Sequence, residues 1–346
     1  MFDKAQKYCW DLLPQLLNCE GVAGYCDKTR VFLEERLKKL GFKIHITNKG
    51  GIIVKLKGKN SDKIRLLTAH MDTLGAMVTS IGSSGRIYLT AIGGVSPLSI
   101  EGEYVNIETM SGQRYRGTVL LDNPSAHVNK DAYDGGRTFQ NISVRLDEKV
   151  QNAEDVKKLG IETGDFCFFD PRVEVTESGF VKARHLDDKA GVAAMVGAML
   201  YLQEEKITLP YETWFYISAA EEVGHGTTSL LPANCFELVA VDMGALGGGL
   251  AGDEFSVSIC VKDSSGPFDY ELRKKIVGIA QKNELPYKLD VYPYYGSDAA
   301  AAIRTGLDAR HALFGPGIDA SHSYERVHRD ALDATLKLIA YYVQEK

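Results

Sequence analysis

The chain has 346 residues, 45% of them hydrophobic and 25% charged, which is typical of a globular protein with a sizeable core and about two domains. Its net charge of −6 and the lack of a basic run exclude nucleic acid and anionic membranes as expected partners. The longest apolar run, GVAAMVGAMLYL, is too short to span a bilayer. The N-terminal stretch carries acidic residues and lacks a signal-peptide core, and the six scattered cysteines form no C-x-x-C pair, so we predict a cytoplasmic protein with reduced thiols.

The first part of the chain is predicted to be helical and then extended. Residues 3–41 carry apolar side chains near helical spacing, and Gly41 can end the helix. The segments GGIIVKLKG and KIRLLTAH then predict strands. The second is almost entirely apolar, which is typical of a strand covered on both faces, and it leads to His70 and Asp72.

Residues 75–181 differ from the rest of the chain in composition and hydrophobic pattern. They are rich in glycine and contain short alternating runs, from GRIYLTAIGG to SGFVKAR, with one predicted helix at 150–159. Such spacing favours a small all-β, barrel-like domain. Because helices and apolar strands alternate again afterwards, we interpret 75–181 as an insertion into a layered α/β domain formed by 1–74 and 182–346.

The resumed α/β segment contains three apolar strands and four helices. The strands are TWFYISAA, FELVAVDMG and RHALFGPG, and the helices are expected at 188–205, 268–283, 297–305 and 329–345.

Residues of the kind that bind metals follow several of these predicted strands. His70 and Asp72 stand at the end of the strand predicted at KIRLLTAH. The adjacent pair Glu221 and Glu222 follows TWFYISAA, and Asp242 comes at the end of the strand segment FELVAVDMG, before its last two residues. His322 lies beyond RHALFGPG, and Asp187 and Asp188 precede a helix. Because open α/β sheets bind ligands beyond the carboxyl ends of their strands, we expect a metal site at this edge.

The types of residue indicate which metals the site would bind. Imidazole combined with carboxylate suits Zn, Co or Mn. The candidates outnumber the three protein ligands of a catalytic tetrahedral Zn, but they suffice for two ions if one carboxylate bridges them. The positive charge of two divalent ions would balance the negative charge of three carboxylates and one hydroxide. A two-metal site also accounts for the Glu221–Glu222 pair, because one glutamate can bind metal while its neighbour stays free as a base.

Five motifs carry a resemblance to a known family. TAHMDT, HLDDKAGV, AAEEVG, AVDMG and DASHSYERVH resemble, in order and spacing, the motifs of the dinuclear metallo-aminopeptidases of the glutamyl and tetrahedral aminopeptidase family, which also contains proteins labelled endoglucanase. The resemblance covers nearly the whole chain. It implies a phosphorylase/hydrolase-like α/β/α metallopeptidase domain with an inserted β domain that covers the site and helps to build a homo-oligomer, such as a dodecamer.

The resemblance also implies a set of metal ligands. His70 and Asp242 would bind one divalent ion, and Glu222 and His322 would bind the other. Asp187 would bridge the two ions and would be followed by a cis peptide bond. Zn is the first choice for both ions, with Co or Mn as alternatives.

Two further roles follow from the same resemblance. Glu221 would be the general base that takes a proton from the attacking water and passes it to the leaving amine. Asp72 would hold the imidazole of His70 in position. The expected substrates are short peptides with a free N-terminus.

Other functions compete with this interpretation. A same-fold amidase or deacylase acting on N-acyl amino acids or peptide amides would use the same site. A glycoside hydrolase needs two carboxylates and no metal, so it leaves His70 and His322 without a role. A non-catalytic binding module would not need the full ligand set together with Glu221.

Several residues near the motifs have simpler interpretations. Asp188 is predicted to cap its helix, and Asp298 to cap a helix near the site. His185 is expected to line the substrate pocket. The sequence NKGG at 48–51 departs from the family pattern, which leaves that pocket less defined than the chemistry.

Overall fold

The computed structural model describes residues 2–346, which fall into two compact units. One unit combines the chain up to Thr73 with Val173–Lys346, and the other is Leu74–Arg172. Each unit is described by itself below.

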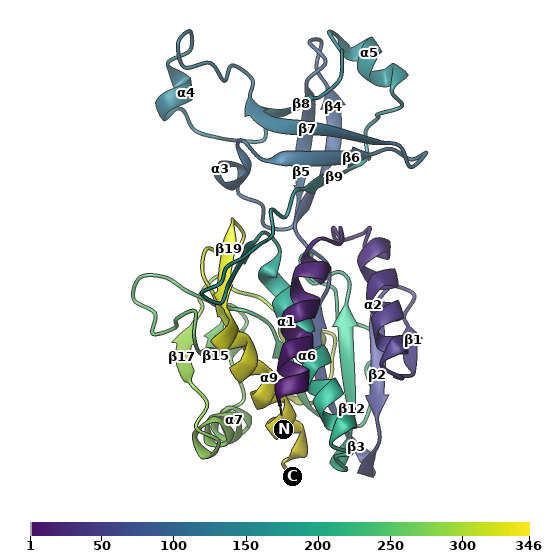
Figure 1. The fold of residues 1–346 in the computed structure, drawn as a ribbon, viewed down its shortest axis with the longest axis vertical. Coiled ribbons are helices and arrows are strands. Elements are labelled where there is room, and N and C mark those ends of the chain that lie inside the picture. The colour runs from purple at the N-terminus through teal and green to yellow at the C-terminus, as the bar shows by residue number, and fades with distance from the viewer. Residues whose placement is uncertain (1) are drawn as a thin grey trace. The chain divides into compact units, whose positions relative to one another are not determined.

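A ten-stranded mixed sheet forms the centre of the larger unit (Figure 1). Its order is β1-β2-β12-β3-β13-β18-β15-β16, with β17 beside β15 and β14 beside β18. Neighbours among β12, β3, β13 and β18 pair in parallel, so their carboxyl ends share one edge. The strands are β1 Ile44–Ile46, β2 Ile52–Leu56, β3 Gly58–His70, β12 Leu209–Ser218, β13 Cys235–Val241, β14 Gly244–Ala245, β15 Val257–Asp263, β16 Gly266–Pro267, β17 Tyr287–Val291 and β18 Arg310–Ile318.

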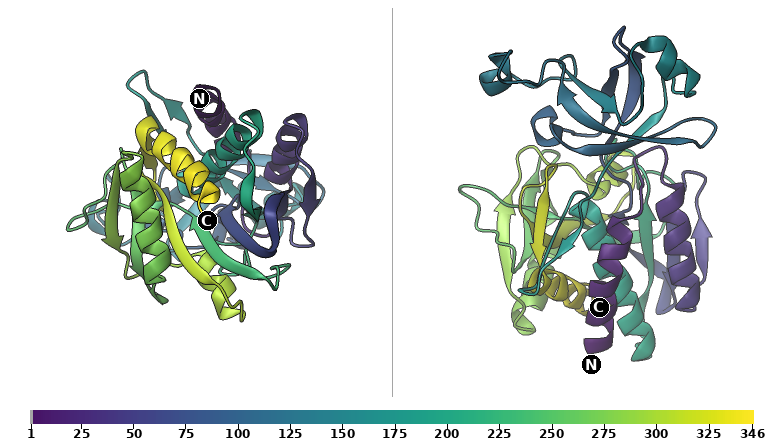
Figure 2. Two further views of the ribbon diagram at one scale, coloured as in Figure 1. Left: turned by 90° about the horizontal axis from the view of Figure 1, so that it is seen from below. Right: turned by 45° about the horizontal axis from the view of Figure 1, so that its top comes forward.

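Helices cover both faces of this sheet. Seen from below in Figure 2, α1, α6 and α9 lie next to one another, and α8 packs against β3, β13 and β18. The two faces follow from the strand period of two, because successive side chains point to opposite sides. Leu67 and Val239 therefore join the core under α6 and α9, while their neighbours Leu66 and Leu238 join the core under α8. The helices are α1 Asp3–Leu17, α2 Asp27–Lys39, α6 Leu186–Glu204, α7 Tyr270–Lys282, α8 Asp298–Arg304 and α9 Arg329–Gln344.

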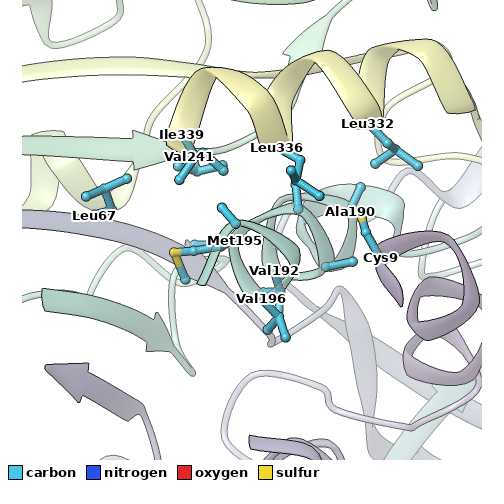
Figure 3. Packing of buried hydrophobic residues seen from close by; sticks show 14 of the residues in the cluster. Cys9, Leu67, Ala190, Val192, Met195, Val196, Val241, Leu332, Leu336 and Ile339 are labelled. Atoms are coloured by element: carbon cyan, nitrogen blue, oxygen red, sulfur yellow. The ribbon is translucent and has the colours of Figure 1, made fainter. Parts of the chain in front are cut away.

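The central helix, α6, is buried almost throughout, which explains why its apolar residues show little helical periodicity. Figure 3 shows Leu336 and Ile339 of α9 turned toward α6, where Val192 and Met195 lie, with Cys9 of α1 beside them. Full burial of an aliphatic side chain contributes about 1.5–3 kcal/mol, so this helix anchors the layer that supports the sheet edge.

The smaller unit is a closed barrel with strand order β4-β5-β8-β7-β6-β9. Its apolar side chains, among them Val105, Val119 and Val144, alternate inward to form a separate core. The barrel strands are β4 Gly75–Ile81, β5 Ile87–Ile92, β6 Tyr104–Glu108, β7 Arg114–Leu121, β8 Ile142–Leu146 and β9 Phe166–Phe169, and the helices of this unit are α3 Pro97–Ile100, α4 Asp131–Asp134 and α5 Ala153–Lys158.

A three-stranded sheet, β10-β11-β19, belongs to the larger unit. Its strands are β10 Glu174–Val175, β11 Phe180–Ala183 and β19 Glu325–His328. The segment SGFVKAR thus pairs with β19, far along the chain, and not with the barrel strands that precede it.

The prediction that residues 3–41 are helical is confirmed for α1 and α2 and is wrong for the segment between them. Two helices form instead, because the chain between them pairs with the end of the first metal-site motif: Thr73 donates its N–H to the carbonyl of Gly21 at 2.8 Å. Strand β15 was not anticipated, although its burial is nearly complete.

Within residues 2–346, the structure has no helix that combines the length and the apolar character needed to cross a bilayer.

Candidate active site

Parallel pairing brings the ends of three strands to one edge of the sheet. Strand β3 ends at His70, β13 is followed by Asp242, and β12 is followed by the loop that carries Glu221 and Glu222. Ser218 and His70 are direct neighbours in the parallel register. Polar side chains from distant parts of the sequence therefore meet where such sheets bind ligands.

Asp187 lies between two imidazoles. Its Oδ1 is 3.2 Å from Nε2 of His70, and its Oδ2 is 3.4 Å from Nε2 of His322. The Asp187–Asp188 peptide bond is cis, as the family resemblance implied. Each oxygen of one carboxylate thus faces a different histidine, which is the arrangement that a bridging ligand requires.

The two adjacent glutamates approach different histidines. Oε2 of Glu221 is 3.7 Å from Nε2 of His70, and Oε2 of Glu222 is 3.8 Å from Nε2 of His322. Asp242 is buried, and its carboxylate, like that of Glu222, lies within 4.8 Å of a ring nitrogen of His70. The structure therefore brings together every side chain predicted for the site.

Asp72 is fully buried and supports both the imidazole and the glutamates, although not in the expected way. The main-chain oxygen of Asp72 is 3.0 Å from Nδ1 of His70, whereas its carboxylate is 3.7 Å from that nitrogen. The carboxylate instead accepts the N–H groups of Glu221 and Glu222, each at 3.1 Å. One residue thus fixes the ring through its carbonyl and the glutamate pair through its side chain.

Asp188 lies near the same point as His70 and Asp242, but its oxygens are already engaged. Oδ1 accepts the N–H of Gly191 at 3.2 Å, and Oδ2 accepts the N–H of His70 at 3.2 Å. The dihedral angles of Asp187 and Asp188 are non-helical, so the first bond caps the regular part of α6 that follows them, and the predicted capping role is confirmed. We therefore do not add Asp188 to the candidate metal ligands.

Glu325 was missed by the sequence analysis, although it lies within the motif DASHSYERVH. This buried carboxylate accepts the N–H groups of Leu186 and Asp187 at 2.6 and 3.3 Å, and that of His322 at 3.1 Å. It joins two segments that carry candidate ligands. A charged residue in a strand motif is a weak signal, because two of its three partners, Leu186 and Asp187, lie in a segment far away in the sequence.

Two neighbouring predictions have different outcomes. The cap of helix α8 is Ser297, whose hydroxyl accepts the N–H of Ala300, so the prediction that Asp298 caps this helix is wrong. Asp298 is instead buried and faces the strand ends. His185 directly precedes α6 in a left-handed conformation, and its expected place in a substrate pocket stays a prediction.

The electrostatics of the cluster favour added positive charge. Burial raises the pKa values of Glu221 and Glu222 well above their ordinary range, and it raises the pKa of Asp242 to about 7. For Asp187, burial acts in the same direction, but the two imidazoles outweigh it and lower the pKa. For His70, burial opposes protonation, yet the hydrogen bond with Asp187 and the nearby carboxylates raise the pKa.

Divalent cations fit this donor set. Several carboxylates are buried around two imidazoles, and burying charge without compensation is costly. Mixed imidazole and carboxylate donors suit Zn, Co or Mn, and cations at this position would supply the missing positive charge.

Comparisons with known proteins agree with this geometry. Residues 50–338 match the family model described as M42 glutamyl aminopeptidase. YhfE of Bacillus subtilis (strain 168), which carries an aminopeptidase name, is 51% identical over 334 residues, 96% of each chain.

Solved structures share the fold. The TET1 peptidase of Pyrococcus horikoshii, which can assemble into a tetrahedron or a large octahedral shell, has a TM-score of 0.83 at 25% identity, covering 98% of this chain and 100% of that chain. An endoglucanase structure from Thermotoga maritima has a TM-score of 0.72 at 20% identity over 96% of each chain, which shows the fold alone. The predicted fold class, an α/β domain with an inserted barrel, is confirmed.

Proposed function

Because the chain belongs to the M42 glutamyl aminopeptidase family, we propose that it is a metal-dependent aminopeptidase that removes N-terminal residues from short peptides. The family and the fold support a peptidase in general. The observation that carries the finer proposal is the position of Asp187, with one carboxylate oxygen toward each of two imidazoles.

In this proposal two divalent ions bind per chain. His70 and Asp242 would hold one ion, Glu222 and His322 would hold the other, and Asp187 would reach both. Zn is the first choice for both ions, with Co or Mn as alternatives. When bound, such ions supply Lewis-acid chemistry that makes a water molecule acidic enough to act near neutral pH and polarises the peptide carbonyl.

Glu221 moves the proton in this proposal. Its carboxylate would accept a proton from the water and donate it to the leaving amine. Burial raises the pKa of this group, which suits a residue that must hold a proton briefly and then release it. Asp72 holds the main chain of Glu221 and Glu222 in place because its carboxylate accepts both of their N–H groups.

Restoration of activity by metal tests the function. We expect dialysis against a chelator to abolish hydrolysis of aminoacyl substrates, and added Zn, Co or Mn to restore it. N-acetylated peptides and N-acyl amino acids serve as matched controls, because an aminopeptidase requires a free amine. Full activity in the metal-free chain would contradict the proposal. Preference for the acylated substrates would favour the amidase or deacylase, and metal-independent cleavage of a polysaccharide would favour the glycosidase.

We also propose a closed homo-oligomer, such as a dodecamer, which the barrel unit helps to form. The TET1 peptidase supports this, because that protein forms large shells. Light scattering should give a mass several times the 38.0 kDa of one chain. A monomer mass at working concentration would contradict it. The cytoplasmic location and the reduced state of the six cysteines, all free in the structure, stay predictions.

A further inference from the structure

The loop that carries the glutamate pair is closed by one carboxylate outside the proposed ligand set. We call residues 219–226 the doublet loop. The hydroxyl of Ser218, just before this loop, donates to Oδ2 of Asp298. Thr227, just after it, donates its N–H to Oδ1 at 2.7 Å and its hydroxyl to Oδ2 at 2.9 Å. Both ends of the doublet loop therefore bind the same side chain.

Asp298 is only 3% exposed, and its neighbours suit a carboxylate held by neutral donors. The hydroxyl of Thr68, two residues before His70, lies 3.4 Å from Oδ2 and 2.7 Å from the hydroxyl of Thr227. Charge-assisted hydrogen bonds of this kind are stronger than neutral ones, and a buried carboxylate needs them. The same carboxylate thus contacts the strand that ends in the candidate ligand His70.

The main chain of the doublet loop lies very close to the carboxylate of Asp298 at Gly226. A side chain at Gly226 would collide with both carboxylate oxygens of Asp298 and with the hydroxyl of Ser218. Glycine is therefore needed at this point for the main chain to reach the carboxylate.

The rest of the doublet loop has its own supports. Glu221 and Gly224 form a turn with a 2.6 Å hydrogen bond, and the N–H of His225 donates to the carbonyl of Ala220 at 3.0 Å. The ammonium of Lys49 donates to the carbonyl of His225 at 2.7 Å. These bonds shape the loop internally, whereas Asp298 fixes where its two ends meet the sheet.

We propose that Asp298 is a positioning residue that places Glu221 and Glu222 for the reaction by closing the doublet loop at both ends. Asp298 does not itself bind metal or substrate in this account. The inference rests on the proposed function of Glu221 and Glu222, and its test must separate the two.

Hydrogen exchange in the metal-free chain gives a readout that does not depend on activity. Asp298→Ala should raise the exchange rate of amides in residues 219–227 by roughly tenfold or more, because the bond from the Thr227 N–H is lost and the loop ends are released. Ser297→Ala is the matched control, since it removes the cap of the same helix without touching the loop, and it should leave these amides unchanged.

A double-mutant cycle with Glu221→Gln then tests whether the effect passes through the glutamate. Asp298→Ala alone should lower kcat by about ten- to a hundredfold in protein that carries its full metal content. The reason is that Glu221, once displaced, transfers protons less efficiently. In the Glu221→Gln background the same change should lower kcat less than about twofold. Equal losses in both backgrounds would overturn the proposal.

The outcomes separate the two claims. If Glu221→Gln keeps full activity, the proposed function fails. If that variant is inactive but exchange in 219–227 is unchanged by Asp298→Ala, only the positioning claim fails. Should Asp298→Ala not fold, Thr227→Val removes the hydroxyl bond to Asp298, together with the contact to the Thr68 hydroxyl, and should still raise local exchange severalfold. Unchanged exchange in that variant would also overturn the proposal.

Discussion

Two pairs of buried ionisable groups lie along β3 and β13, one in the middle of the sheet and one at its carboxyl edge, where Asp242 directly follows β13. The two pairs differ in the charge of the groups around them. In the middle of the sheet, Arg65 of β3 and Glu237 of β13 are partners in the parallel register and form an ion pair of 2.8 Å. Lys275 adds a second cation at 3.0 Å from the carboxylate. At the carboxyl edge of the same strands, His70 and Asp242 belong to a cluster in which carboxylates outnumber the two imidazoles.

The interior cluster holds the end of the chain in place. Arg65 is fully buried and also donates to the carbonyls of Tyr342 and Glu345 at 3.0 and 2.9 Å, and the hydroxyl of Tyr342 donates to Glu237 at 2.8 Å. Its single carboxylate lies beside two cations, so this cluster carries no excess negative charge, as expected of one that contributes to structure. The edge cluster has excess negative charge, as expected of a site that receives cations. The sign of the excess charge therefore distinguishes the two clusters.

Removing the interior arginine should have the largest effect on stability. Arg65→Ala leaves Glu237 buried beside one remaining cation and frees the chain end, so we expect the free energy of unfolding to fall by about 3–5 kcal/mol. Guanidinium denaturation of the metal-free chain measures this. The control, Lys7→Ala, breaks the exposed pair with Asp11 and should change the free energy by about 0.5 kcal/mol or less. Equal effects from the two variants would contradict the assigned structural role.

The pH dependence of Glu237 should give a smaller effect. Burial acts to raise its pKa, but Arg65 and Lys275 outweigh burial and lower it. The charged form then stabilises the fold above the unfolded pKa of about 4.3, and this contribution is lost as the pH falls toward the lower folded value. The free energy of unfolding of Glu237→Gln should therefore be lower than that of the parent by about 2 kcal/mol at pH 7. This difference should become smaller below about pH 5. A difference in unfolding free energy that stays constant or increases as the pH falls would contradict this prediction.

Much of the site could be predicted because its signals are local. Three of the motifs join an apolar strand to polar residues at its carboxyl end, and parallel pairing brings those ends together without any knowledge of their contacts. His70, Glu222 and Asp242 were located in this way, whereas Asp187 precedes a helix and His322 lies beyond a strand. The ligand roles of all five rest on the family resemblance and stay predictions.

The parts that were missed depend on contacts between distant residues. Two of the N–H donors of Glu325, those of Leu186 and Asp187, and the hydroxyl partners of Asp298 come from distant segments, so neither role has a clear local signature. Likewise, β11 alternates like the barrel strands before it, and only its pairing with β19 assigns it to the larger unit.

The direct test of the central claim compares amide variants of the two adjacent glutamates. Glu221→Gln removes proton transfer but no proposed metal bond, so it should keep two ions per chain while kcat falls by about 10²–10⁴-fold. Glu222→Gln weakens one proposed ligand, so it should lower metal content, with partial recovery of activity when metal is added. Neither change should lower the stability of the metal-free chain, since each replaces a buried carboxyl group whose charged form is disfavoured by burial. If Glu221→Gln loses metal and Glu222→Gln does not, the two roles are reversed. If both variants keep full activity, the carboxylate-rich edge is not the catalytic site.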